Sequence, residues 1–558
     1  MTTHTGAHPC QCRDRQSPGP EIAVRHKTNP RPARQTLGMD THALAQLAID
    51  AAGDAGPGVV IGIYRGGELT HHASAGMASV ELSAPVHERT RFDIASMSKQ
   101  FTATAILLLA RDGLLALTDD IRAHLPELRL STPVTIAQCL QHTGGLREWL
   151  QLTGIAGRSL TRITQNQTLA FVSGLTELNF PPGTAFSYSN TGYVLAASLV
   201  QRLTGRTLGE FTTERLFAPL GMHRTLFRED SLAVLDDFAY GYATVGDRLL
   251  RADTEECAVG DGGLATSVSE LGPWFRFLRD GDVIGADIRD ALVDSTPVFP
   301  DGSRGTYALG IYHATLGGSP MVGHAGGVLG YRSQLFYLPE HDLGVVALTN
   351  HSAVDARLVA LDAARLATGI AEDVPPSPVA GTVDASAHAG WWLMPGADEA
   401  VHTEARDDGT LELSGLQSGR FTLAEDDWWY ADDAEGGLRL RVEGDDLRVG
   451  IAAWPGRDMI FQRCSAPDEN LPIPSGVYES PELGTLATIH DDGAFQLGLE
   501  LTGRLEPGAG GTLRAGPASL RTEGDDLLLS LFGAERLRFV RQPADTTIVG
   551  VPRGLDAS

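Results

Sequence analysis

The feature that most constrains the fold is a change in residue pattern near residue 373. Before it, segments with helical periodicity lie between two groups of apolar, β-branched runs, near 58–64 and 332–349. After it, helical periodicity disappears, and short alternating segments are separated by Asp- and Gly-rich turns. A chain of 558 residues also exceeds what one hydrophobic core usually serves. The sequence therefore predicts a mixed α/β part followed by an all-β part.

The all-β part repeats its own sequence. Three matches occur in the same order and about 80 positions apart: 407–409 with 491–493, 443–447 with 523–527, and 461–463 with 539–541. A single Asp-Asp-Gly match would indicate only a common turn, whereas three ordered matches indicate a duplicated unit. We therefore expect two related β modules, each a small antiparallel barrel that closes its own sheet edges.

These patterns together predict the domain organisation. Strands at both ends of the first part, with helices between them, indicate an α/β layer that carries a helical insertion. The first 38 residues lack the apolar core of a secretory signal, and patterned sequence begins at Met39, an alternative start. The expected segments are a disordered leader at 1–38, the α/β domain at 39–372, a linker at 373–384, β-barrels at 385–466 and 467–545, and a tail at 546–558.

Charge and composition exclude several function classes. The net charge of −26, without a Lys/Arg block, disfavours nucleic acid and anionic membranes as partners. The longest apolar run, 105–110, is far below the roughly 20 residues of a membrane span. Five scattered cysteines without a pairing pattern indicate reduced thiols. The missing apolar core of a secretory signal predicts a cytoplasmic protein. Because no His/Cys cluster has metal-ligand spacing, we expect neither a metal nor another cofactor.

Lysine is almost absent from the chain. Of 44 basic residues only two are lysine, Lys27 in the leader and Lys99. Arginine replaces lysine at most surface positions, but a guanidinium stays protonated above about pH 12, whereas a buried ammonium can be tuned toward neutrality. We interpret Lys99 as retained for its chemistry; the alternative is survival by chance.

Ser96 and Lys99 lie three residues apart at the start of a helix predicted to end at Arg111. Residues i and i+3 share one helix face, so the amine can reach the hydroxyl. The helix N-terminus favours a developing alkoxide, and a desolvated, neutral lysine can take the serine proton. The pair is typical of a nucleophile and its base; the alternative is a capping serine beside a solvated lysine.

Tyr188 and Asn190 directly precede a helix predicted over 193–203. A phenol can pass a proton to a leaving group, and the amide can bind a substrate carbonyl while orienting the lysine. The alternative is a core tyrosine and a helix-capping asparagine.

The third candidate element is His324-Ala-Gly326-Gly327, which introduces a strand predicted to run to Leu338. Small residues there would let a substrate lie along the strand edge, and the Gly327 N–H would complete an oxyanion hole with that of Ser96. His142 and His388 also begin H-x-G triplets. The first lies too early in the chain and the second beyond the linker, so both are interpreted as structural.

In this order, Ser96-x-x-Lys99, Tyr188-x-Asn190 and His324-x-Gly326 resemble the three motifs of the serine β-lactamase and penicillin-binding protein superfamily. The phrases at 140–146 and 262–267 resemble its class C branch and related esterases. The resemblance covers about residues 45 to 370 and implies the penicillin-recognising fold, an antiparallel sheet with helices and an all-helical insertion. His324 departs from the pattern, because β-lactamases and transpeptidases usually have lysine there.

Histidine in that position, followed by two β-barrels, is similar to the D-aminopeptidases, which release N-terminal D-residues from peptides and amides. This resemblance implies that Ser96 is acylated, that Lys99 accepts and returns the proton, and that Tyr188 is its partner. It also implies a metal-free cytoplasmic homodimer, in which a loop of the last barrel limits substrate length. The glycine-rich turn at Glu506, Pro507 and Gly508 is the candidate loop; the alternative is a surface turn.

Two other functions stay open at this stage. A carboxylesterase, weak β-lactamase or DD-peptidase-like hydrolase would share the fold, but such enzymes commonly lack paired barrels. A non-catalytic, penicillin-binding-type sensor would use the barrels for recognition, and retention of Lys99 disfavours it.

Overall fold

The computed structural model describes residues 39–53, 56–371, 376–380, 383–415, 418–432, 437–451, 457–498 and 501–543. The expected leader at 1–38 and tail at 546–558 lie outside the described residues, as does part of the expected linker at 373–384.

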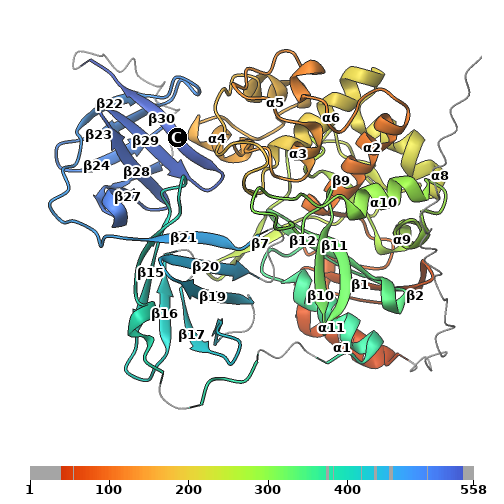
Figure 1. Ribbon diagram of the computed structural model, residues 1–558. Coiled ribbons are helices and arrows are strands. Elements are labelled where there is room, and N and C mark those ends of the chain that lie inside the picture. Colours follow the sequence, from red (N-terminus) through yellow and green to blue (C-terminus); the bar gives the residue numbers. More distant parts are fainter. Residues whose placement is uncertain are drawn as a thin grey trace, which may run out of the picture. The chain divides into compact units, whose positions relative to one another are not determined.

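A six-stranded antiparallel sheet forms the centre of the first part (Figure 1). Its strands, in spatial order, are β10 (Tyr312–Leu316), β11 (Ser319–Val328), β12 (Tyr331–Leu338), β13 (Leu343–Thr349), β1 (Val59–Arg65) and β2 (Glu68–Ala75). Strand β1 pairs with β13, in a register that places Val59 opposite Thr349. The two strand-rich ends of this part therefore meet in one sheet, as the sequence predicts.

One predicted strand is in fact a hairpin. The single strand expected from His324 to Leu338 is wrong, because the chain reverses at Leu329 and Gly330 between β11 and β12. Leu329 has a φ of 39°, in the left-handed region typical of tight turns. A Cβ at Gly330 would lie 2.2 Å from the backbone nitrogen of Tyr242, so only glycine fits this approach.

Each face of the sheet has its own hydrophobic core. Helices α1 (Thr41–Ala52) and α11 (Ala356–Thr368) cover one face, where they pack on side chains such as Ile61 and Val345 (Figure 1). The adjacent residues Val60 and Val346 point to the other face, toward the helical segments. This alternation follows from the period of two along a strand, and it explains why β1 and β13 are apolar throughout.

The helical segments lie between β2 and β10. They comprise α2 (Lys99–Arg111), α3 (Ile136–Leu140), α4 (Trp149–Ile155), α5 (Gln165–Val172), α6 (Thr191–Thr204), α7 (Leu208–Thr212), α8 (Ala218–Leu220), α9 (Gly272–Asp280) and α10 (Ala286–Asp294). Helix α2 is buried from Lys99 to Leu109, as expected for a helix that is apolar on most sides. Short strands interrupt this region: β3 (Met77–Ser79), β4 (Ala84–Pro85), β5 (Phe92–Asp93), β6 (Leu226–Phe227), β7 (Tyr242–Val245), β8 (Arg248–Arg251) and β9 (Leu264–Thr266).

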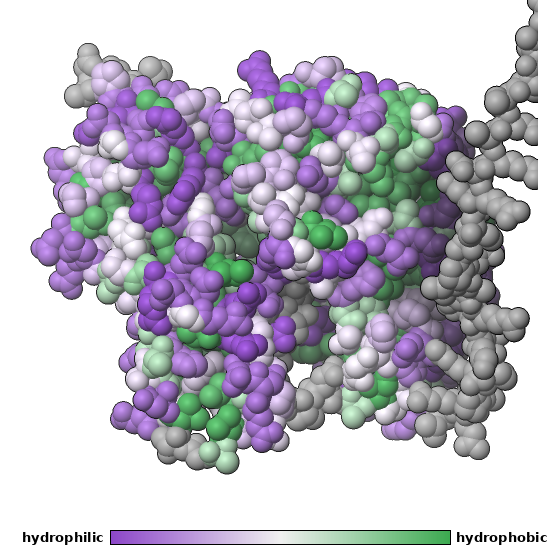
Figure 2. Space-filling model, in the orientation of Figure 1, coloured by the Kyte–Doolittle hydropathy of each residue, from purple (hydrophilic) through white to green (hydrophobic). Residues whose placement is uncertain are grey.

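The first β module is a closed antiparallel barrel. Its strands are β14 (Gly390–Leu393), β15 (Ala400–Ala405), β16 (Leu411–Ser414), β17 (Gly419–Leu423), β18 (Trp429–Ala431), β19 (Leu438–Glu443), β20 (Asp446–Ile451) and β21 (Met459–Cys464). Trp392, Phe421, Trp429 and Phe461 fill its interior. Hydrophilic residues cover most of the visible surface of both modules in Figure 2, as expected where alternate residues face solvent.

The second β module is a nearly closed antiparallel sheet. Its strands are β22 (Gly476–Glu479), β23 (Leu486–Ile489), β24 (Ala494–Leu497), β25 (Leu501–Arg504), β26 (Glu506–Pro507), β27 (Leu513–Ala515), β28 (Ala518–Glu523), β29 (Asp526–Leu531) and β30 (Ala534–Arg541). Strands β25 and β26 occupy opposite ends of the sheet, yet only Leu505 separates them in sequence. The sheet must therefore curl until its two edges approach each other.

The repeated sequences occupy equivalent places in the two modules. The Asp-Asp-Gly turns join β15 to β16 and β23 to β24, and the Glu-Gly-Asp-Asp turns join β19 to β20 and β28 to β29. Phe461 and Phe539 lie on the last strand of each module, and both are fully buried. The predicted fold class, a β-lactamase-like domain followed by two antiparallel barrels, is confirmed.

Candidate functional site

A tight turn holds Ser96 between β5 and α2. Residues Ala95–Ser98 form one turn of 3-10 helix, which Ala95 enters with a φ of 48°. The Ala95 N–H donates to Asp93 Oδ1 at 2.9 Å, and Ser98 Oγ donates to the Ala95 carbonyl at 2.5 Å. Leu264 of β9 donates to Ser98 Oγ at 3.2 Å. Ser96 is partly exposed while its immediate neighbours are buried, so its side chain is presented on a rigid support.

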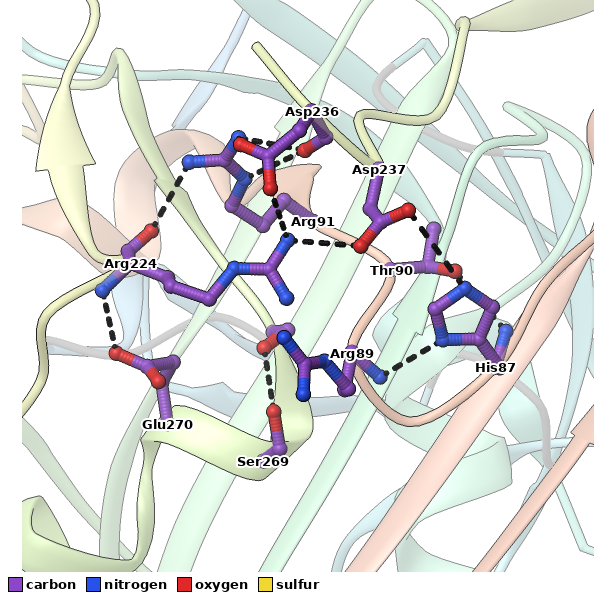
Figure 3. Close-up of polar contacts among 10 residues, drawn as sticks. His87, Arg89, Thr90, Arg91, Arg224, Asp236, Asp237, Ser269 and Glu270 are labelled. Atoms are coloured by element: carbon purple, nitrogen blue, oxygen red, sulfur yellow. Dashed lines mark hydrogen bonds and ion pairs between the residues drawn. The ribbon is translucent and has the colours of Figure 1, made fainter.

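A polar network anchors the chain just before this turn (Figure 3). The side chain of Arg91 is only 4% exposed, and it donates to the backbone carbonyl of Asp236 at 3.0 Å. Arg224 forms ion pairs with Asp236 and Asp237, and its N–H donates to Glu270 at 2.8 Å. These contacts fasten the segment that leads into β5 to the residues that flank β6, at 224 and at 236–237.

Lys99 is completely buried, and its amine contacts three acceptors. Lys99 Nζ lies 2.8 Å from Ser96 Oγ, 2.7 Å from Asn190 Oδ1 and 2.7 Å from the carbonyl oxygen of Asp261. The rings of Tyr188 and Tyr193 lie beside it, with centroids 4.9 and 5.4 Å from Nζ. The predicted approach of the lysine amine to the serine hydroxyl is therefore present in the structure.

The surroundings of Lys99 shift its pKa in opposite directions. Burial lowers the pKa from 10.5 to about 8, while the charges of Asp261 and Glu148 raise it. Desolvation dominates because a charged amine loses more hydration than a neutral one. A substantial fraction of Lys99 is therefore neutral near pH 8, which a proton acceptor requires.

Tyr188 lies against Ser96 on the side of the 179–190 loop. Burial raises the pKa of its hydroxyl well above 10, although a hydrogen bond with Ser96 acts in the opposite direction. The phenol thus stays protonated at neutral pH and is available as a proton donor. Its ring packs on His142, with the ring centroids 4.1 Å apart.

Asn190 precedes α6 and connects Lys99 to a buried acid. Its N–H donates to Glu148 Oε2 at 2.6 Å, and its side-chain nitrogen donates to Glu148 Oε1 at 3.3 Å. These bonds leave the amide oxygen of Asn190 facing Lys99. Burial raises the pKa of Glu148 to about 7, although the hydrogen bonds that it accepts lower it. The expected role of Asn190 in orienting the lysine fits this geometry.

His324 lies on β11 as a buried, neutral side chain. Its Nδ1 is 2.5 Å from the Ala325 carbonyl, which can only accept, so Nδ1 carries the proton. Its Nε2 then accepts from the Tyr307 hydroxyl at 2.8 Å. Burial, aided by the positive charge of Lys99, lowers the pKa of His324 to about 3. The third predicted motif therefore presents an uncharged imidazole at neutral pH.

Gly326 and Gly327 follow His324 on the strand edge beside Ser96. Strand β10 pairs with β11 only as far as Gly323, so the edge beyond it is not covered by β10. A Cβ at Gly326 would lie 2.1 Å from the Ile94 carbonyl, so glycine is needed for the serine turn to approach β11. Gly327 lines the same cavity as Ser96.

Two cavities adjoin these side chains. The first has a volume of about 90 Å³, and the residues lining it include Ser96, Asn190, Gly327, Asp93, Glu256 and Asp261. The second, of about 570 Å³, is lined by Tyr188 and by residues of both β modules. Its lining is mostly apolar, with side chains such as Phe186, Met394 and Phe532.

Several site residues carried no local sequence signal. Glu148 directly precedes α4, whereas Glu256 and Asp261 lie on the segment between β8 and β9, and these acids meet Lys99 and Ser96 only in the folded chain. His142, interpreted as structural, stacks on Tyr188 and accepts from the Ser189 N–H at 3.1 Å. The phrases at 140–146 and 262–267, which flank Glu148 and Asp261, were the available signal.

The glycine-rich turn predicted as a specificity loop contacts the first β module and the segment that follows it. Gly510 N donates to the Ser465 carbonyl at 2.9 Å, and a Cβ on Gly510 would contact Leu393 of the first module. None of the contacts of Glu506, Pro507 or Gly508 in the described part of the chain joins the turn to Ser96, and its role stays a prediction. The β29–β30 turn instead approaches the site, since the Gly533 carbonyl accepts from the Glu148 N–H at 2.8 Å.

No group of three or more His, Cys, Asp or Glu side chains in the described residues is arranged to hold a metal ion. Within the same residues, the helices are too short or too polar to span a membrane.

Comparison with known proteins gives a family match and curated relatives. The family model described as Beta-lactamase matches residues 45–369. The chain is 27% identical over 389 residues to a D-aminopeptidase of Cereibacter sphaeroides (strain ATCC 17029 / ATH 2.4.9), covering 68% of this chain and 73% of that protein. It is 30% identical over 345 residues to a D-aminopeptidase of Brucella anthropi, covering 61% and 64%.

Solved structures share the fold at lower identity. An octameric penicillin-binding protein homologue from Pyrococcus abyssi aligns with a TM-score of 0.55 and 22% identity, over 76% of this chain and all of that one. The structure described as SurE aligns with a TM-score of 0.54 and 23% identity, over 76% of this chain and 98% of that one.

Proposed function

The chain belongs to the β-lactamase family. We propose that it is a serine hydrolase that releases N-terminal D-amino acids from short peptides and amides. The names of its curated relatives support the D-aminopeptidase activity. In this proposal Ser96 is the nucleophile, Lys99 the base and Tyr188 the acid. Asn190, His324, Gly326 and Gly327 bind or border the substrate.

The hydrogen-bond partners of Lys99 supply the first step. A neutral amine keeps two N–H bonds, and Asn190 Oδ1 and the Asp261 carbonyl can only accept. When these two acceptors hold both N–H bonds, the lone pair of Nζ faces Ser96 Oγ. Lys99 then takes the hydroxyl proton as Oγ attacks the substrate carbonyl.

The remaining steps return every proton. The N–H groups of Ser96 and Gly327 stabilise the oxyanion of the tetrahedral intermediate. Tyr188 gives its proton to the leaving amine and regains one from the Lys99 ammonium, which leaves an acyl-enzyme on Ser96. Water then attacks the ester with Lys99 as base, and the proton returns to Ser96 as the amino acid leaves.

The acidic cavity beside Ser96 is the observation that supports a substrate with a free amino group. Asp93, Glu256 and Asp261 line it together with one cation, Arg228. The Arg228 guanidinium is already engaged by Asp93 at 3.6 Å and by Thr254 at 3.0 Å. Burial, reinforced by the charges of Asp261 and Asp93, raises the pKa of Glu256 to about 7. An ammonium group in this cavity would relieve that repulsion, so the cavity suits the free amino group of an N-terminal residue.

The same charges disfavour carboxylate-bearing antibiotics. A β-lactam carboxylate would meet an acidic cavity and a neutral His324, whose pKa of about 3 leaves it uncharged at neutral pH. Electrostatic complementarity therefore favours a cationic acyl group over an anionic substrate.

A substrate panel tests the reaction. Wild type and Ser96→Ala are incubated with D- and L-alanine p-nitroanilide, p-nitrophenyl acetate and a chromogenic cephalosporin. We expect the D-anilide to be the preferred amide and Ser96→Ala to be inactive. Turnover of the ester alone would contradict the aminopeptidase, turnover of the cephalosporin alone would indicate a β-lactamase, and no turnover at all would indicate a sensor.

A matched pair of variants tests the ammonium site. Glu256→Gln should raise the KM for D-alanine p-nitroanilide by about tenfold or more, because a hydrogen bond between charged groups is lost. The KM for p-nitrophenyl acetate, which has no amino group, should hardly change. Glu255→Gln is the control, since Glu255 is exposed. Equal effects of Glu256→Gln on both substrates would contradict this assignment.

The proposal includes a homodimeric, cytoplasmic enzyme without a metal, as the family resemblance implies. Light scattering on the purified chain measures the subunit number, and activity after dialysis against a chelator tests the metal.

A further inference from the structure

The second β module contacts the candidate site through the turn between β29 and β30. The Gly533 carbonyl accepts from the Glu148 N–H at 2.8 Å and from Asn179 Nδ2 at 3.0 Å. Asn179 Oδ1 in turn accepts from the Glu535 N–H at 2.9 Å. Three hydrogen bonds therefore fix this turn to the α/β domain.

A second turn of the module, between β22 and β23, contacts Arg147, the residue before Glu148. Arg147, whose side chain is 4% exposed, forms an ion pair with Glu482, which is 11% exposed. Glu482 Oε1 also accepts from the N–H groups of Thr176 and Glu177, both at 2.8 Å. The dipeptide 147–148 is thus held by two separate turns of the second module.

From Glu148 a continuous chain of hydrogen bonds leads to Ser96. The Glu148 carboxylate accepts from Asn190 N at 2.6 Å, Asn190 Oδ1 accepts from Lys99 Nζ at 2.7 Å, and Nζ is 2.8 Å from Ser96 Oγ. The same carboxylate caps α4 by accepting from Leu150 N at 3.1 Å. Any displacement of Glu148 must therefore move the amide that orients the lysine.

The fit at Gly533 leaves no space for a side chain. Its φ is +76°, and an added Cβ would lie 2.7 Å from Glu148 Cβ and 3.5 Å from Glu148 Cγ. Gly524, in the β28–β29 turn of the same module, has a similar φ of +62° with nothing within 4 Å of an added Cβ. Alanine has a similar conformational cost at both positions, because both have a positive φ. Only at Gly533 would its Cβ clash with Glu148.

We propose that the Gly533 turn of the second β module is a positioning element for the catalytic lysine, acting through Glu148 and Asn190. The module is then part of the catalytic apparatus and acts on Lys99 indirectly, through its contact with Glu148. This inference rests on the proposed function, in that Ser96 must be a nucleophile activated by Lys99.

If Glu148 positions Lys99, its charge should also affect the pKa of the Lys99 amine. The acids that act on Lys99 are Glu148 and Asp261, and both raise its pKa. The other groups around it are His142 and His324, each with a lowered pKa, and the rings of Tyr188 and Tyr193. Neutralising or displacing Glu148 should therefore lower the pKa of Lys99, whereas a purely structural role would not move it.

The experiment measures the rate at which a fluorophosphonate modifies Ser96, followed by mass spectrometry from pH 5 to 10. This measurement needs no D-amide turnover. An error in the proposed substrate would therefore leave the test of the Gly533 turn unaffected. Gly533→Ala and Glu148→Gln should each lower the plateau rate at high pH by about 10-fold to 100-fold, because the lysine is misplaced. Both should also move the midpoint of the pH profile to lower pH.

Gly524→Ala is the matched control and should leave the plateau and the midpoint at their wild-type values. The double variant Gly533→Ala/Glu148→Gln should match Glu148→Gln alone, because both changes act on one link. Equal losses in Gly533→Ala and Gly524→Ala, or an unmoved midpoint in Glu148→Gln, would overturn the proposal. A wild-type protein whose Ser96 is not modified at any pH would contradict the nucleophile itself and the inference with it.

Discussion

The amine of Lys99 lies 2.8 Å from the hydroxyl of Ser96, and the same amine contacts two oxygens that can only accept hydrogen bonds. These contacts orient the lone pair of the neutral amine. Two N–H bonds are held away from the serine, so the lone pair is presented to the serine proton. In the proposed mechanism the lysine is therefore preorganised as a base rather than merely close to the nucleophile.

Replacing Lys99 by arginine should abolish this chemistry. A guanidinium keeps its proton at any accessible pH and cannot accept the proton of Ser96. We expect Lys99→Arg to lower kcat/KM for D-alanine p-nitroanilide by about 10³-fold, within the range for loss of a general base. Lys99→Met, which removes the charge but retains much of the volume, should lose a similar factor. Thermal unfolding separates this loss from misfolding, and a Lys99→Arg enzyme with wild-type activity would exclude the base.

The pH dependence should report the protonation of Lys99. Because only the neutral amine accepts a proton and its pKa is about 8, kcat/KM for p-nitrophenyl acetate should rise with pH to a midpoint near 8 and then level off. D-Alanine p-nitroanilide should show the same rise, followed by a fall, since its own ammonium loses a proton near pH 8. A falling limb with the ester as well would assign that limb to the protein instead.

The parts of the site that the sequence predicted are those encoded by short spacing. Ser96 and Lys99 lie one helical turn apart, and Tyr188 and Asn190 precede a helix, so local geometry already places them. Glu148, Asp261 and Glu256 reach the site only through long-range packing, and a lone acid in a loop has no periodicity to identify it. Sequence alone therefore predicted the reacting pair but not the acids that tune it.

The fold shows the same division. Alternating patterns and repeated turns predicted two β modules, whose equivalent phenylalanines, Phe461 and Phe539, are both buried. The hairpin at Leu329 was missed because its turn has no Asn-Gly or Asp-Gly signal and the flanking residues continue the strand pattern. The glycine-rich segment 508–511 predicted a loop near the site. The contact with Glu148 is instead made by Gly533, a single glycine that forms no recognisable sequence motif.

Placing a cation at the third motif should change substrate preference. His324→Lys introduces a buried ammonium near Lys99, whose charge already acts on this position. Like charges should lower the pKa of Lys99 and move the rising limb below pH 8. We also expect a lower KM for a chromogenic cephalosporin, because its carboxylate gains a partner. His324→Gln is the neutral control; a cephalosporin KM that falls equally in both variants would contradict the charge argument.

The junction of the two modules depends on Asp398, which is 1% exposed and paired with Arg521 at 3.0 Å and Arg536 at 3.1 Å. Asp398→Asn removes the charge and leaves two arginines without their partner. Since these arginines are 28% and 45% exposed, solvent offsets part of the loss, and we expect a destabilisation of about 2 kcal/mol. Urea unfolding followed by tryptophan fluorescence measures it, since Trp392 and Trp429 in the core of the first module are among the reporting side chains. Asp445→Asn is the control, because Asp445 is 92% exposed and lies 3.9 Å from Arg463. If both variants unfold at the same urea concentration, the buried ion pairs do not hold the modules together.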